Sequence, residues 1–258
     1  TPHWLTGAVI ALLALSILIG GIKSIGRVCG FFVPKMAVFY FVMGIAVIYM
    51  NRANLGQGIA MIFKMGLSPR AVAGGVGGTI VSGLFSSMRW GIARGIFSNE
   101  AGLGSAPIVA AAAKTDHPSR QGYINMTGTF FDTLVVCSVT GLIVASSGVL
   151  GSVDSHGKLI TGAALTMKAF EKALGPAGEI CVGLGIVMFA FSTIIGWEYY
   201  GEKALAYLVK KTSYIKLYRV VYSFVIFVGA TVPLQLVWNF SDTMNGLMAV
   251  PNLICLLV

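Results

Sequence analysis

Charged residues are scarce in this sequence. Of its 258 residues, 10% are Asp, Glu, Lys or Arg and 56% are hydrophobic, whereas an ordinary soluble domain is about 25% charged. A soluble fold of this size could not bury so much apolar surface, but a bilayer surrounds apolar helices with an apolar solvent. The composition therefore excludes an ordinary soluble protein and predicts an all-α polytopic membrane protein in contact with lipid.

Acidic residues number only 9, against 18 Lys and Arg, which gives a formal net charge of +9. In a soluble protein such an excess would indicate nucleic-acid binding. The basic residues here lie at the ends of apolar runs, where they set the orientation of a membrane protein. We therefore expect no nucleic-acid partner.

Motifs for metal binding, phosphate binding and nucleophilic catalysis are missing. The four cysteines are far apart, without a C-x-x-C pair or a histidine at ligand spacing, so we expect neither a disulfide framework nor a metal site. The run Gly74–Gly78 lacks a preceding strand and a Gly-Lys-Ser/Thr, and close helix packing explains it better than phosphate binding. Ser105 has no histidine that can be assigned as its base, which argues against an intramembrane serine protease. We expect no cofactor and no enzyme activity.

Long apolar runs dominate what is present, and a full membrane span needs about 20 such residues. We expect a single transmembrane domain over residues 1–258. Residues 53–66 are amphipathic and are predicted to form an interfacial or re-entrant segment. Because the sequence starts without Met and stops inside an apolar run, we interpret it as a fragment of a longer protein. The apolar segments cover roughly 7–22, 37–50, 71–97, 103–113, 127–150, 177–208 and 218–237, with an incomplete one from about 243.

Turn signals and loop charges predict a topology. Val33-Pro34 is expected to end the first loop, Ser68-Pro69 to begin a helix, and Asp154–Gly157 to form a polar turn. With Thr1 outside, the predicted cytoplasmic loops carry 10 basic residues and the outer loops 6, a bias that favours this orientation. The dense basic cluster at 203–219 decides the choice, so we expect that loop in the cytoplasm.

The segment 71–113 is too long for one straight crossing, and polar residues interrupt it. Within it, Ser98–Pro107 carries glycine, serine and asparagine, which weaken a helix or compete for its backbone groups. Pro107 is tolerated only in a first helical turn. We predict a discontinuous helix in which one half ends near Phe97 and the other begins with Ser105 as its N-cap.

A helix break inside a membrane has chemical uses. Irregular backbone survives there only where protein buries it or where it lines a polar cavity. The first half-helix presents free carbonyl groups suited to a cation, and the second presents free N–H groups suited to a carboxylate. Discontinuous helices form the substrate sites of many secondary transporters, so a zwitterionic amino acid with a coupling cation fits. The alternative is a plain helix-turn-helix loop at the membrane surface.

The residues around the break also resemble those of a known family. The run Gly91–Pro107, GIARGIFSNEAGLGSAP, is similar to the signature of the alanine or glycine:cation symporters. The resemblance implies a leucine-transporter-like fold of two inverted five-helix repeats, in which the visible spans are core helices 4–10 and 71–113 is the sixth. The first three helices would be absent, and with them part of the binding site. Further matches, in the expected order, are Gly20–Ile25, Gln121-Gly122, Phe131–Thr133, Gly196–Glu202 and Pro251-Asn252.

The resemblance implies the identity of several site residues. Trp197 and Thr193 are four residues apart and share a helix face, and in the related fold this helix faces the substrate. In the related fold, hydroxyl groups of this helix also coordinate sodium, a hard cation that prefers oxygen ligands. The resemblance therefore implies that Ser192 and Thr193 are cation ligands. Trp197 could instead belong to an interfacial belt, and the two hydroxyls could instead bond their own helix backbone. The predicted substrate-binding residues are Ser98, Asn99, Gly102, Gly104, Ser105, Thr193 and Trp197.

Four charged residues near the break, Arg89, Arg94, Glu100 and Asp132, are predicted to form gating or structural ion pairs. Intramembrane carboxylates are costly and functional by default, but Asp132 could equally cap a neighbouring threonine or pair with an arginine. Arg89 and Arg94 are five residues apart, about 140° around a helix, so they do not form one cationic face.

Together these features predict sodium-coupled symport of a small neutral amino acid, alanine or glycine, across the cell inner (plasma) membrane. Sodium is the expected coupling ion. Two alternatives stay open: a proton-coupled amino-acid transporter with Glu100 or Asp132 as the carrier, and a channel or sensor that keeps the fold. A channel should show a continuous polar stripe through several helices, whereas polarity here is concentrated at one break.

Overall fold

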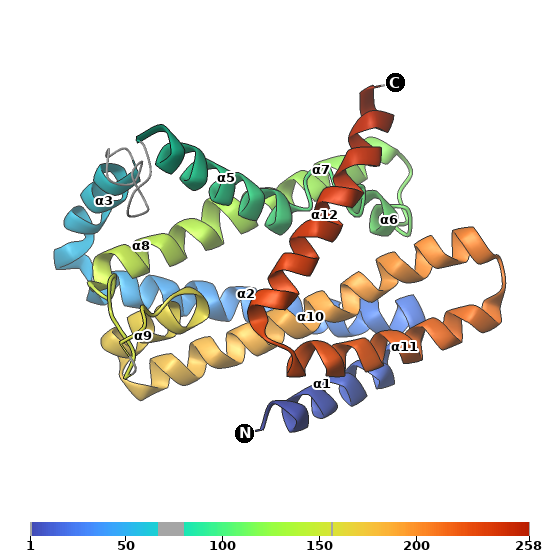
Figure 1. The fold of residues 1–258 in the computed structure, drawn as a ribbon, viewed down its shortest axis with the longest axis horizontal. Coiled ribbons are helices and arrows are strands. Elements are labelled where there is room, and N and C mark those ends of the chain that lie inside the picture. The colour runs from blue at the N-terminus through green and yellow to red at the C-terminus, as the bar shows by residue number, and fades with distance from the viewer. Residues whose placement is uncertain (1, 67–79, 156, 258) are drawn as a thin grey trace. The chain divides into compact units, whose positions relative to one another are not determined.

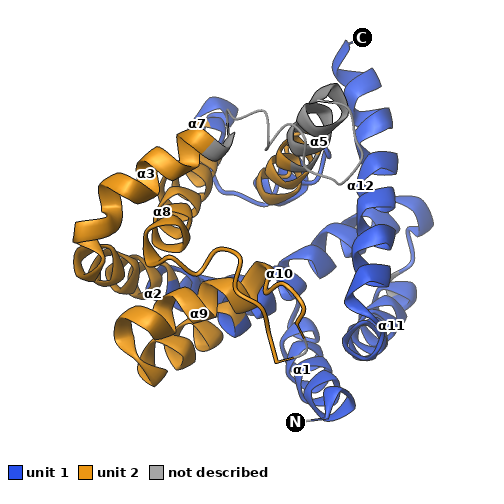
Figure 2. Cartoon of the chain, turned by 60° about the vertical axis from the view of Figure 1, so that its left-hand side comes forward, with its two compact units in different colours: residues 1–36, 102–122, 187–258 blue, residues 37–101, 123–186 orange. Residues whose placement is uncertain are grey.

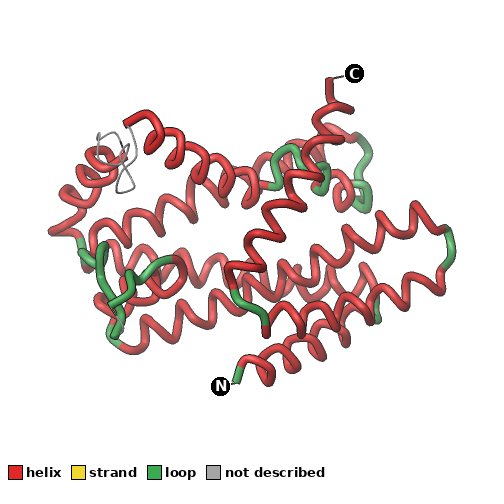
Figure 3. The backbone as a smooth tube through the Cα atoms, in the orientation of Figure 1, coloured by secondary structure: helices red, strands yellow, loops and turns green. Residues whose placement is uncertain are grey.

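Helices make up the architecture of the described residues (Figure 1, Figure 3). The computed structural model describes residues 2–66, 80–155 and 157–257. Within those ranges, extended pairing is confined to one isolated bridge between Val153 and Leu159. The all-α prediction is therefore confirmed. The helices are α1 His3–Leu18, α2 Gly21–Met50, α3 Arg52–Gly66, α5 Ile80–Asn99, α6 Ala106–Ala110, α7 Pro118–Thr129, the π-helix η1 Phe130–Cys137, α8 Ser138–Ser147, α9 Gly162–Leu174, α10 Pro176–Val209, α11 Thr212–Thr231 and α12 Leu234–Leu257.

Helix α2 runs without interruption from Gly21 to Met50 and contains Pro34. The predicted loop ending at Val33-Pro34 is therefore wrong. Proline removes one intrahelical hydrogen bond, but in membrane helices neighbouring groups and local adjustments satisfy the freed carbonyl. The chain turns earlier, after α1 ends at Leu18, where Gly21 takes a φ of +63° that glycine adopts at little cost.

Helices α7, η1 and α8 form one continuous run, Pro118–Ser147, of 30 residues. It begins before the predicted start at 127, because a proline suits the first turn of a helix. Its middle is the π-helix η1, which contains Asp132. A π segment widens the turn locally and often occurs at functional sites.

The turn predicted at Asp154–Gly157 is confirmed. The Gly157 N–H donates to the Asp154 carbonyl at 3.1 Å, and the Lys158 N–H donates to Asp154 Oδ1 at 2.9 Å. This side-chain bond to the backbone is the usual reason for aspartate in a turn.

The last two helices differ from the predicted segments in their bounds. Helix α11 ends at Thr231, and α12 begins at Leu234, well before the incomplete span expected from about 243. Pro233 lies between them and favours a first helical turn over a continued helix. The predictions for Ser68-Pro69 and Gly74–Gly78 lie outside the described residues.

Four helices of the described residues are long and apolar enough to cross a membrane: Gly21–Met50, Pro118–Ser147, Pro176–Val209 and Ser213–Thr231. Helix α1 is apolar but shorter. Many large apolar side chains on these helices are exposed, among them Phe224 at 64% and Val38 at 63%, as expected for surfaces that lipid covers. The chain is a multi-pass helical membrane protein.

The chain divides into two compact units (Figure 2). Unit 1 comprises residues 1–36, 102–122 and 187–258, and unit 2 comprises 37–101 and 123–186. Each unit has its own apolar core. In unit 1, α1 lies against α11, and a Cβ on Gly7 would approach Ala230 Cβ to 2.8 Å, the kind of close contact that small residues permit between membrane helices. Its core contains Ala14, Leu18, Ile25, Ile195 and Tyr199.

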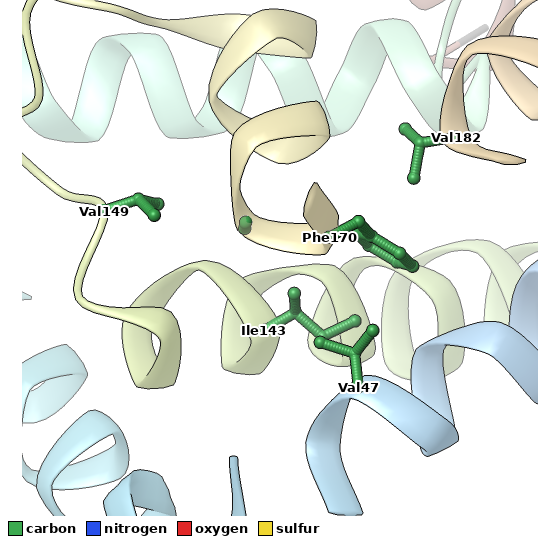
Figure 4. Close-up of a cluster of buried hydrophobic side chains, with 6 residues drawn as sticks. Val47, Ile143, Val149, Phe170 and Val182 are labelled. Atoms are coloured by element: carbon green, nitrogen blue, oxygen red, sulfur yellow. The ribbon is translucent and has the colours of Figure 1, made fainter. Parts of the chain in front are cut away.

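The core of unit 2 brings four helices together (Figure 4). Val47 of α2, Ile143 of α8, Phe170 of α9 and Val182 of α10 are all almost completely buried. Residues 53–66, predicted to be an amphipathic segment, belong to helix α3, which packs on α8. The contact is close because Gly58 has no side chain; a Cβ there would lie 3.0 Å from the Ser146 nitrogen.

Candidate substrate and cation site

The predicted break in the helix is present. Helix α5 ends at Asn99, two residues beyond the predicted Phe97, and α6 begins after Ser105. Between them Glu100, Gly102 and Gly104 have φ values of +51°, +74° and +76°. Glycine adopts such angles readily, whereas a non-glycine residue there is uncommon and costs energy. The backbone of 100–104 therefore departs from the helix, and two of its three left-handed positions are glycines.

Ser105 lies at the N-cap position of α6 and is completely buried, but its side chain makes no capping hydrogen bond. Its expected role as a capping side chain is therefore wrong, although its position is right. Its φ and ψ of −79° and −44° are already helical, whereas a capping serine normally has extended backbone. Helix α6 has only five residues, so the positive end expected at its start is weak, because the dipole comes from aligned peptide units.

An asparagine of α12 holds the second half of the break. Asn252 Nδ2 donates to the Gly102 carbonyl at 3.0 Å. Its Oδ1 lies 2.8 Å from the position that a Cβ on Gly104 would occupy. Gly104 thus provides the space that Asn252 fills, and the two glycines and Asn252 form what we call the Asn252 clasp, all within unit 1.

The last residues of α5, directly before the break, form hydrogen bonds with η1 within unit 2. Ser98 Oγ donates to Asp132 Oδ2, and Asn99 Nδ2 donates to Thr133 Oγ1 at 2.8 Å. Thr133 Oγ1 also lies 3.1 Å from Asn99 Oδ1. The hydrogen-bonded partner of Asp132 is thus Ser98 of α5, a predicted substrate-binding residue, and not one of the threonines or arginines that the sequence suggested. Arg94 lies over the Phe97 ring, with Cζ 5.6 Å from its centroid.

The hydroxyls predicted as cation ligands bond the backbone of α10. Ser192 Oγ and Thr193 Oγ1 each donate to the Phe189 carbonyl at 2.9 Å. This is the alternative that the sequence left open. It uses the hydroxyl protons and leaves oxygen lone pairs as acceptors, so it is compatible with cation binding. Trp197 is half-buried and packs edge-on against Tyr200, with ring centroids 5.4 Å apart.

The predicted site residues are divided between the two units. Ser98, Asn99 and Glu100 belong to unit 2, and Gly102, Gly104 and Ser105 to unit 1. Unit 1 also contains the predicted site residues of α10, which are Ser192, Thr193 and Trp197. The break therefore has two sets of contacts, each inside its own unit.

A family model for the sodium:alanine symporters matches residues 1–258. The chain belongs to the sodium:alanine symporter family. The sodium/alanine symporter AgcS of Methanococcus maripaludis is 48% identical over 257 residues, which are 98% of this chain and 54% of that protein. An uncharacterized transporter of Haemophilus influenzae is 42% identical over 99% of this chain and 54% of its own length. The probable sodium/glutamine symporter GlnT of Bacillus subtilis is 35% identical over 93% and 48%.

The chain spans about half the length of these relatives. The sodium:alanine symporter family and its named members are transporters and not enzymes. The resemblance carried by Gly91–Pro107 is therefore confirmed at the level of the family. The protease interpretation of Ser105 is excluded.

Sequence reasoning did not identify Asn252 or the pair Glu198 and Glu202 as functional candidates, although they lie in motifs that match the sodium:alanine symporter family. The sequence indicates no contact for Asn252, because a bond across 150 residues leaves no local pattern. Glu198 and Glu202, inside the matching run Gly196–Glu202, are both buried. The signal that could have found them was their i, i+4 spacing in an apolar helix, since intramembrane carboxylates on one face are functional candidates by default.

Proposed function

We propose that the full-length protein containing this chain is a sodium-coupled symporter of a small neutral amino acid, alanine or glycine. The observation that carries the proposal is the non-helical segment 100–104 inside the run Gly91–Pro107, where backbone carbonyl and N–H groups leave the regular helical hydrogen-bond pattern. Such groups bind zwitterions in transporters. The 48% identity to a protein named a sodium/alanine symporter supports alanine and sodium. Because one relative is named a probable sodium/glutamine symporter, the test below compares glutamine with alanine and glycine.

In this proposal the backbone around Gly102 and Gly104, with the side chains of Ser98, Asn99 and Ser105, receives the amino and carboxylate groups of the substrate. Trp197 and Thr193 face the small side chain, and Ser192 and Thr193 contribute oxygen ligands to sodium. An aromatic wall favours a methyl or hydrogen side chain by leaving little room for a larger one. Arg89, Arg94, Glu100 and Asp132 act as structural or gating charges.

The proposal extends to fold and topology. We propose a leucine-transporter-like arrangement in which this chain supplies core helices 4–10 and a preceding helix supplies the other half of the site. The protein would lie in the plasma membrane with the basic segment 203–219 in the cytoplasm. That segment contains the turn between α10 and α11, which carries Lys210 and Lys211, and positive charge is favoured on that side.

The test is uptake of labelled alanine into vesicles that contain the full-length protein, with an imposed sodium gradient and without one. Accumulation above the external concentration, abolished when choline replaces sodium, is the expected result. Unlabelled glycine and glutamine are added as competitors to rank the substrates. Accumulation driven equally well by a pH gradient in choline would favour proton coupling, and uptake that only equilibrates would favour a channel; either result overturns the proposal.

A further inference from the structure

Helices α10 and α11 enclose two acidic side chains within unit 1. Glu198 and Glu202 are four residues apart, so they lie on the same face of α10. Glu198 is completely buried, and Glu202 is 6% exposed. This face is directed at α11, because Arg219 of α11 contacts Glu202.

Arg219 neutralises one of these carboxylates, and its guanidinium is already engaged. Its Nε and Nη2 donate to Glu202 Oε2 at 2.8 and 2.7 Å. Its Nη1 donates to the Ile19 carbonyl at 3.1 Å, at the end of α1. The guanidinium therefore balances the charge of Glu202 and connects α11 to the α1–α2 junction. None of these three bonds goes to Glu198.

Two tyrosines of α11 contact α10 on either side of Glu198 along the helix. Tyr222 donates its hydroxyl proton to the Ile194 carbonyl at 2.8 Å, one turn before Glu198 on α10. The Tyr218 hydroxyl lies against Gly201, where a Cβ would collide with it. Neither carboxyl oxygen of Glu198 has a hydrogen-bond partner among the described residues.

The other elements that pack on this face bring no compensating charge within the described residues. Helix α1, which lies against α11, has one titratable side chain, His3, at its far end. From α2, Cys29 borders the adjoining apolar cluster, which also holds Tyr199 and Tyr222. Lys203 of α10 lies over the Tyr199 ring, with Nζ 5.0 Å from its centroid. The charged groups that act on Glu198 are Glu202 and Arg219.

An ionised carboxylate in this position would be unpaired, buried and beside a second carboxylate. Burying a lone charge is so unfavourable that the group takes up a proton instead. We propose that Glu198 is a proton-binding site, at which the carboxyl group holds one proton while α10 and α11 enclose it. A sodium ion is the rival occupant, but it needs several oxygen ligands, and the Tyr222 hydroxyl is already engaged with Ile194. A proton requires no additional volume.

The proposal is independent of the solute that the protein carries, and its test needs no transport. Purified full-length protein in lipid nanodiscs is measured by infrared spectroscopy at neutral pH, where a protonated carboxyl group has a carbonyl band that a carboxylate lacks. We expect Glu198→Gln to lose part of this band. The matched control, Glu179→Gln, alters an exposed carboxylate in the first turn of the same helix and should leave the band unchanged.

A second variant keeps the proposal testable if Glu198→Gln does not fold. Glu202→Gln frees Arg219 to pair with Glu198, which should then ionise, so the band should weaken in this variant as well. The proposal is overturned if wild type and both variants show the same band. It is also overturned if the band of the wild type is absent in sodium and appears when choline replaces it, because the occupant would then be the metal ion.

Discussion

Replacing Gly104 by alanine tests whether the Asn252 clasp sets the shape of the break. Gly104 has a φ of +76°, and a left-handed conformation costs an L-residue with a Cβ roughly 1–2 kcal/mol. The new Cβ would also lie 2.8 Å from Asn252 Oδ1, so the asparagine side chain must move. Loss of its bond to Gly102 removes a further 0.5–1.5 kcal/mol, approximately. The combined effect of about 2 kcal/mol corresponds to roughly a 30-fold change in an equilibrium.

Two matched variants separate strain from collision. A Cβ on Gly102 meets only Leu253 Cδ2, at an ordinary 3.5 Å, while its φ of +74° is equally unfavourable. Gly102→Ala should therefore show the strain alone, roughly a tenfold effect. Gly95→Ala lies inside α5 with open space around its Cβ, and there alanine favours the helix by about 1 kcal/mol.

The assay is sodium-dependent alanine binding to purified full-length variants, with membrane insertion and thermal unfolding measured beside it. We expect affinity to fall roughly 30-fold in Gly104→Ala, less in Gly102→Ala, and to stay unchanged in Gly95→Ala. Combined with Asn252→Ala, the Gly104→Ala effect should shrink, because the colliding atom is gone and coupled residues are not additive. Normal affinity in Gly104→Ala, or strict additivity with Asn252→Ala, would refute the reasoning.

Three further predictions follow from other parts of the chain. Trp197→Ala should weaken alanine binding by about 1–3 kcal/mol through lost apolar contact; equal affinity in a correctly inserted variant would return Trp197 to the interfacial belt. Lys211→Cys, in a background without the four native cysteines, should react with an impermeant thiol reagent only in inside-out vesicles, and labelling of intact cells would reverse the topology. Gly201→Ala should lower the unfolding temperature, because its Cβ meets the Tyr218 hydroxyl, at a cost of about 1–3 kcal/mol. Gly196→Ala, which has open space at its Cβ on the same helix, should leave the unfolding temperature unchanged. Equal unfolding temperatures of the two variants would contradict the packing of α10 on α11.

The break could be predicted because its cause is local. Gly102 and Gly104 permit left-handed backbone, and Pro107 restarts a helix, so the interruption follows from residue types within ten positions. The course of α2 could not be predicted in the same way. Pro34 normally ends a helix in water, but a helix in lipid has no solvent to satisfy an open turn, so the helical path through it is retained.

The buried charges of α10 show a different limit of sequence reasoning. Glu198 and Glu202 share one face and one sequence motif, yet among the residues that the structure describes only Glu202 has a cationic partner. That difference depends on where Arg219 lies, 17 positions after Glu202 and on another helix. Spacing along one helix predicts which side chains share a face, but the pairing of each depends on how the neighbouring helix packs.

Packing, more than local hydrogen bonding, also orders the break itself. A single hydrogen bond from Asn252 contributes about 0.5–1.5 kcal/mol, less than the roughly 1–2 kcal/mol that each ordered residue of the segment costs in backbone entropy. Burial must therefore provide most of the stabilisation. Leu103, at 3% exposure, contributes about 1.5–3 kcal/mol, and Ser105, two residues later, is completely buried. Because Gly104→Ala disturbs the clasp and leaves the side chain of Leu103 intact, the variant should change ligand binding more than folding.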